Sequence, residues 1–228
     1  MGIITGYICL ISFMVLALKF VARKAKFNRV NRFLQIIHKP VSCIFFATGV
    51  LHFIIVLPVL KGRNIFVTIS GIIALAFAIV LVVLCHTIKN GQKKMHWHRM
   101  MTVLILMLLV VHVIVYYVDF IRYLNAVSGI EISDVNVNEI PDGEYTGKYD
   151  VGYIYAKVKV TVADGKISDI EILEHRNERG SKAESIIEDI LEEQRIDVDA
   201  VTSATNSSLV IEKACENALS DWYIINKK

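Results

Sequence analysis

The stretch HRMMTVLILMLLVVH, residues 98–112, holds an apolar run between two histidines. A second stretch, HKPVSCIFFATGVLH at residues 38–52, repeats the same spacing and again has a basic residue after its first histidine. Fourteen residues of α-helix rise about 21 Å, and at 100° per residue the second histidine returns to within about 40° of the face of the first. Each stretch therefore predicts a helix that presents two histidines on one side at two depths.

These helices are predicted to lie in a membrane. The chain is 54% hydrophobic with a mean hydropathy of +0.51, and its apolar residues are concentrated in the first half. A bilayer core takes about 20 residues of helix to cross, and runs of that length are expected at residues 2–21, 41–60, 65–88 and 100–118. No basic residue precedes the first run and no small-residue cleavage site closes it, so it is interpreted as a retained span. The first half is thus predicted to be a four-helix transmembrane bundle.

Lysine and arginine predict the orientation of this bundle. Seven of them lie between residues 19 and 39 and four between residues 89 and 99, whereas the loop between the second and third runs has only Lys61 and Arg63. By the positive-inside rule the two basic loops face the cytoplasm. The N-terminus and everything after residue 120 are therefore expected outside, in a multi-pass protein of the cell membrane. The net charge of +3 is a topology signal, and no nucleic-acid partner is expected.

In this orientation the four histidines pair by depth. His38 and His98 are expected near the cytoplasmic face, and His52 and His112 near the outer face. An ionisable residue inside an otherwise uncharged span marks a functional site, so the two pairs are predicted to be the axial ligands of two haem b groups. Because bis-histidine ligation leaves no open position on the iron, it suits electron transfer. The arrangement resembles that of the membrane cytochromes b over residues 30 to 120.

One ligand of the inner pair has alternatives. Pro40 follows His38 so closely that a helix is expected to begin or kink there. His86 and His96 are therefore the substitutes for His38. Gly49, about one turn before His52, is expected to give a porphyrin room to approach the backbone.

After residue 123 the composition becomes polar and acidic. Residues 153–162 alternate as a strand does, Asp164 and Gly165 predict a turn, and residues 167–173 predict the returning strand of a β-hairpin. Helical patterns over residues 183–194 and 209–222 complete a small α+β domain. The expected domains are a membrane domain at 1–124, a linker at 125–140 and an extracytoplasmic α+β domain at 141–228.

Small and hydroxyl residues precede the last of these helices in the segment DAVTSAT, residues 199–205. A helix N-terminus with free N–H groups can bind a phosphate, although serine and threonine at such a place are most often ordinary caps. The segment resembles Asp-x-x-Ser/Thr-Gly-Ala-Thr, the flavinylation motif of the FMN-binding domain family. That family includes subunits of the sodium-pumping NADH:quinone oxidoreductase and of the Rnf complex. Residues 142–147 and 164–167 also resemble parts of it, so the resemblance covers residues 141–219.

The resemblance implies that Thr205 carries FMN through a phosphoester bond. Asp199, Thr202, Ser203 and Ala204 would form the segment that is recognised for attachment. Ser203 stands where the family usually has glycine, so a turn with positive φ is expected to be strained there. In the family a separate Mg-dependent flavin transferase, which works outside the cytoplasm, splits FAD and passes on FMN. This agrees with the outside placement expected from the basic loops.

These expectations combine into transmembrane electron transfer, from a cytoplasmic or quinol donor such as menaquinol, through two haems to FMN and an extracytoplasmic acceptor. Such a flavocytochrome is an oxidoreductase component. No catalytic residue is assigned, since the outer domain shows no acid–base pair or substrate clamp. Two alternatives stay open: a membrane-tethered flavin shuttle without haem, and a sensory or binding module without flavin. His175 is expected to be an ordinary surface histidine.

Overall fold

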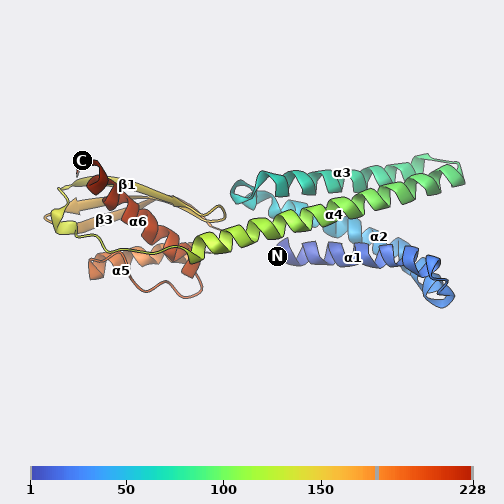
Figure 1. Ribbon diagram of the computed structural model, residues 1–228, viewed down its shortest axis with the longest axis horizontal. Helices are drawn as coiled ribbons and strands as arrows, with labels where there is room; N and C mark the ends of the chain where they lie inside the picture. The colour runs from blue at the N-terminus through green and yellow to red at the C-terminus, as the bar shows by residue number, and fades with distance from the viewer. Residues whose placement is uncertain (1, 178–179, 227–228) are drawn as a thin grey trace. The chain divides into compact units, whose positions relative to one another are not determined.

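The computed structural model describes residues 2–177 and 180–226, with side chains described as far as residue 220. The chain divides into two compact units, Met1–Tyr117 and Val118–Lys228. The first consists of long helices, and the second combines a small sheet with shorter helices (Figure 1).

The first unit is built from helices long and apolar enough to cross a membrane, one for each of the four expected apolar runs. Their bounds are α1 Gly2–Lys24, α2 Asn28–Val56, α3 Ile65–Thr87 and α4 Gly91–Ser128. A 3-10 helix, Leu57–Gly62, follows α2 directly. The last part of α4, from Val118 onward, belongs to the second unit.

Helix α2 begins well before the expected position and contains Pro40 in its interior. The expectation that a helix begins at Pro40 is therefore wrong. Proline is tolerated within membrane helices because neighbouring groups satisfy the freed backbone. His38 consequently lies inside the same helix as His52.

The first unit has a small buried centre. Phe13 of α1, Ala78 of α3 and Ile105 of α4 form one cluster of buried side chains. The hydroxyl oxygens of Tyr7 and Tyr117 lie 2.9 Å apart and join α1 to α4. Most other apolar side chains of these helices are exposed, as expected for helices whose outer surface meets lipid.

The second unit is organised around an antiparallel sheet in the order β1-β2-β3. Its strands are β1 Gly143–Asp150, β2 Tyr155–Ala163 and β3 Lys166–Arg176. Asp164 and Gly165, between β2 and β3, have φ values of 52° and 69°. Positive φ at both central residues is typical of a type I′ turn, whose twist matches that of the flanking strands. The expected hairpin is confirmed.

Three helical segments follow the sheet: a 3-10 helix Ser181–Ser185, α5 Ile186–Glu193 and α6 Thr205–Asn226. Helix α6 packs on β1 and β2. A Cβ atom on Gly147 would collide with the backbone of Ala214 and Ala218, so the glycine lets strand and helix approach closely. Alternate residues of β2, from Ala156 to Val162, face the helix and are fully buried.

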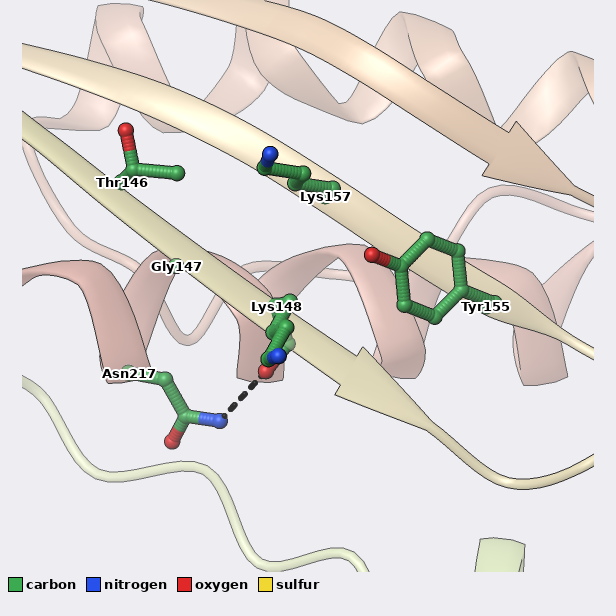
Figure 2. Close-up of a pocket in the computed structure, with 6 residues that line it drawn as sticks. All are labelled: Thr146, Gly147, Lys148, Tyr155, Lys157 and Asn217. Atoms are coloured by element: carbon green, nitrogen blue, oxygen red, sulfur yellow. Dashed lines mark hydrogen bonds between the residues drawn. The ribbon is translucent and has the colours of Figure 1, made fainter.

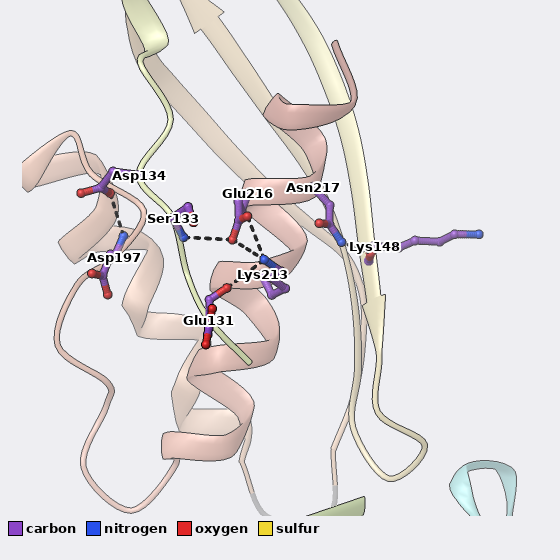
Figure 3. Close-up of polar contacts among 8 residues, drawn as sticks. All are labelled: Glu131, Ser133, Asp134, Lys148, Asp197, Lys213, Glu216 and Asn217. Atoms are coloured by element: carbon purple, nitrogen blue, oxygen red, sulfur yellow. Dashed lines mark hydrogen bonds and ion pairs between the residues drawn. The ribbon is translucent and has the colours of Figure 1, made fainter. Parts of the chain in front are cut away.

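Residues 125–140, expected to be a linker, are instead part of this unit. Val127, Val137 and Ile140 are buried in its core. Lys213 Nζ donates to the carbonyl of Glu131 at 2.8 Å, and the N–H of Ser133 donates to Glu216 Oε2 at 3.2 Å (Figure 3). The core of this unit therefore includes residues of the segment that was expected to be a linker.

Candidate functional site

Thr205 is the first residue of α6, and its side chain is exposed. The preceding Ala204 is 6% exposed and holds the chain in place. Its N–H donates to the carbonyl of Val201 at 2.9 Å, and its own carbonyl accepts from Ser207 N at 2.9 Å and Ser208 N at 3.0 Å. The buried alanine thus anchors a turn that presents the threonine hydroxyl to solvent at the positive end of a helix dipole.

Ser203 has a φ of 69°. This is the left-handed conformation, which costs a non-glycine residue roughly 1–2 kcal/mol. The strained turn expected at this position is present. Asp199 and Thr202, the other members of the segment, are exposed.

The loop before Thr205 is tied to α6 by buried polar groups. The N–H of Val201 donates to Ser208 Oγ at 3.1 Å, and the N–H of Val198 donates to Glu212 Oε1 at 3.2 Å. Ser208 and Glu212 are 0% and 1% exposed. Burial raises the pKa of Glu212 to about 7, despite the hydrogen bond from Val198. The loop is therefore held by side chains from the helix that it precedes.

An aromatic cluster lies beside the start of α6. Asn206 Nδ2 donates to the hydroxyl of Tyr123 at 2.8 Å. The ring of Tyr123 stacks on Tyr153 with 4.5 Å between centroids and 13° between planes, and Phe120 lies 6.2 Å from Tyr123. Sequence reasoning missed this cluster, because Tyr123 comes from the end of α4, far from residue 205 in the chain.

The imidazole of His175 is not at the surface. Its side chain is 2% exposed, and Nδ1 lies 2.9 Å from Glu184 Oε1 and 3.2 Å from Asn177 Nδ2. The expectation of an ordinary surface histidine is wrong because Glu184, in the 3-10 helix after β3, folds back onto it.

A pocket on the sheet lies apart from the 199–205 segment. It is lined by side chains and backbone of β1, β2 and α6 (Figure 2): Thr146, Gly147, Lys148, Tyr155, Lys157 and Asn217. Asn217 Nδ2 donates to the carbonyl of Lys148 at 3.0 Å, which partly covers the edge of β1. None of the residues predicted for the flavin site lines this pocket.

The inner histidines are brought together. The ring centroids of His38 and His98 lie 6.0 Å apart with 38° between planes. Bonds from imidazole nitrogen to a metal are about 2 Å long, so two rings that share one metal have centroids roughly 6 Å apart. The two rings are therefore neighbours, at a separation similar to that of two histidines that share a metal.

The alternatives to His38 are placed differently. His86 and His96 are exposed, and His86 Nδ1 lies 2.9 Å from the carbonyl of Val82 in its own helix. Gly49, expected to face a porphyrin, faces α1 instead, since a Cβ there would lie 3.4 Å from Cys9 Sγ.

The outer histidines lie against glycines of neighbouring helices. A Cβ on Gly6 would lie 3.1 Å from Cε1 of His52, and a Cβ on Gly71 would lie 3.1 Å from Cε1 of His112. In the described part of the chain no three or more metal-binding side chains cluster. Of the two predicted pairs, His38 and His98 are seen to meet, and two is the number of protein ligands that a bis-histidine haem needs.

The comparisons with known proteins concern the second unit. Residues 152–220 match the model of the FMN-binding domain family. The matched region runs from the residues before β2 to the interior of α6 and contains the whole 199–205 segment. Neither a curated protein nor a solved structure matches the chain. The match supports FMN as a cofactor and a flavin-related role in electron transfer.

Proposed function

We propose that this chain is a membrane flavocytochrome that passes electrons across a bilayer, with two haem b groups on its histidine pairs and FMN attached to Thr205. The observation that carries the proposal is the combination of an FMN-binding domain with four apolar helices in which His38 faces His98. Haem and FMN supply one-electron chemistry that side chains lack. Donor and acceptor would lie on opposite sides of the membrane.

The residues of the second unit have a defined task in this proposal. Threonine is a weak nucleophile without an external activator, so a flavin transferase would have to reach its hydroxyl. Exposure of Thr205 at the start of α6 meets that requirement. The buried anchors Ala204 and Ser208 hold the hydroxyl in place. The positive end of the helix dipole would stabilise the phosphate of the attached flavin.

The histidine residues have a task as well. His38 and His98 would hold an inner haem, and His52 and His112 an outer one. Held by two histidines each, the haems would supply electron transfer. The first unit would then conduct electrons rather than carry out oxygen chemistry.

The test is an absorption spectrum of the full-length protein, reduced with dithionite minus oxidised. It is purified from membranes of a host that makes haem and also expresses a flavin transferase. Sharp b-type bands together with bleaching of flavin absorbance are expected. Flavin bleaching without haem bands would support the membrane-tethered flavin shuttle instead. The absence of both signals would support the sensory or binding module.

Attachment is tested separately. Flavin fluorescence should survive denaturing electrophoresis in the parent and disappear in Thr205→Ala. Thr146→Ala, an exposed threonine of the same unit outside the 199–205 segment, is the matched control and should keep its fluorescence. Fluorescence that persists in Thr205→Ala would show that the flavin is attached to another residue.

The extracytoplasmic placement of the second unit is part of the proposal and rests on the basic loops. Ser181 is exposed, so Ser181→Cys should react with a membrane-impermeant maleimide on intact cells, beyond the background given by the native cysteines of the parent. Reaction only after the membrane is disrupted would reverse the orientation.

A further inference from the structure

Two helices that carry no predicted iron ligand each bring a hydroxyl–glycine dipeptide to an outer histidine. Thr5 Oγ1 of α1 lies 3.4 Å from His52 Nδ1, and Gly6 lies against the same ring. Ser70 Oγ of α3 lies 3.0 Å from His112 Nδ1, and Gly71 lies against that ring. The same pair of residue types thus meets the same ring atoms at both sites.

The direction of these hydrogen bonds follows from the hydroxyl groups. Thr5 Oγ1 donates to the carbonyl of Gly2 at 2.8 Å, and Ser70 Oγ donates to the carbonyl of Val67 at 3.0 Å. A hydroxyl has one hydrogen, so each oxygen is left to accept from the histidine. The ring nitrogen Nδ1 must therefore be the donor in both cases.

A second observation supports this direction for His52. Its Nδ1 lies 2.9 Å from the carbonyl oxygen of Gly2, which can only accept a hydrogen bond. A neutral imidazole carries one N–H. With that hydrogen on Nδ1, the lone pair stands on Nε2 and is available to a metal.

We infer that Thr5 and Ser70 are positioning residues that fix His52 and His112 in the Nδ1–H tautomer, so that Nε2 of each can ligate the outer haem iron. Gly6 and Gly71 also help to position these rings, because they leave room for them. A Cβ at 3.1 Å from the ring would force the imidazole to move. The inference rests on the outer haem of the proposed function.

The inner pair differs in the source of the hydroxyl: Thr102, whose Oγ1 donates to the carbonyl of His98 at 2.7 Å, belongs to the same helix as that histidine. Among the described residues, His38 Nδ1 is buried without a hydrogen-bond partner. His98 Nδ1 lies 3.4 Å from Thr102 Oγ1, one turn along the same helix. A hydrogen bond donated by Nδ1–H makes the ligand more basic and favours oxidised iron. Loss of the acceptor at an outer histidine should therefore raise the midpoint potential of the outer haem and leave the inner one unchanged.

The experiment is a redox titration of the haem bands in the full-length protein and in Ser70→Ala. Ser12→Ala is the matched control, because Ser12 and Ser70 are the buried serines of the first unit, at 8% and 9% exposed. Two haems are expected in all three proteins, with an upward shift of one midpoint in Ser70→Ala alone. Ser70→Thr, which keeps the hydroxyl, should restore the parental potential. Thr5→Val should shift the same midpoint in the same direction.

A glycine variant tests whether the packing of Gly71 against His112 matters for haem binding. Gly71→Ala should lower the haem content from two to one, whereas Gly49→Ala, with an ordinary contact of 3.4 Å, should keep both. The inference would be wrong if the midpoint potentials of Ser70→Ala equalled those of the parent, or if Ser12→Ala shifted them by the same amount. Either result would leave the proposed function intact. A parent protein without haem would overturn the proposed function itself.

Discussion

Replacing Ser203 by glycine should stabilise the second unit. Ser203 has a φ of 69°, a conformation that costs an L-residue roughly 1–2 kcal/mol. Glycine removes this cost but loses about 0.5–1 kcal/mol through the extra freedom of the unfolded chain. The difference is a gain of about 0.5–1 kcal/mol in the free energy of unfolding.

The gain can be measured by pulse proteolysis of the full-length protein in urea. The fraction of the second unit that resists cleavage is followed at each urea concentration. With a slope of about 1–3 kcal/mol per molar urea, the unfolding midpoint should rise by about 0.2–1 M. Thr202→Gly is the control, because Thr202 is also exposed but is not among the residues with positive φ. It should lower the midpoint. A Ser203→Gly protein whose midpoint equals or falls below that of the parent would refute the argument from backbone strain.

Two further variants probe the core beside this turn. Burial raises the pKa of Glu212 to about 7, above its ordinary 4.5, so the folded state favours the protonated carboxyl. The contribution of Glu212 to stability should be greatest below about pH 4.5 and should be lost as the pH rises through 7, by about 3 kcal/mol in all. Glu212→Gln should abolish this fall, which urea unfolding across that pH range will show. Gly147→Ala places a Cβ against the backbone of Ala214 and Ala218 and should destabilise the unit by about 2–3 kcal/mol, as a lower urea midpoint.

The parts of the fold that local pattern determines could be predicted. Long apolar runs predicted the membrane helices, and Asp164-Gly165 predicted the hairpin because few residues accept two successive positive φ values. The ends of the helices could not be predicted as well, since α2 continues through Pro40. Strand β1 was missed because it depends on pairing with β2 rather than on its own pattern.

The candidate sites divide in the same way. The 199–205 segment and the four histidines are local motifs, so they were found in the sequence. Their supports are residues distant in the chain, such as Ser70 for His112 and Tyr123 for Asn206. One signal was available: Thr5-Gly6 and Ser70-Gly71 repeat a hydroxyl–glycine dipeptide in the two helices that lack the paired histidines.

Because Val127, Val137 and Ile140 are buried in the core, the second unit can be transferred to another protein only together with these residues. The family match begins at residue 152, so a chimaera made at that boundary would leave out all three residues and strand β1 as well. Its α6 would then meet water along a surface made for apolar contact. A transplant to another membrane anchor would have to include the end of α4 to carry a complete core. The unit that can be inherited or engineered as one piece is therefore larger than the unit that sequence comparison detects.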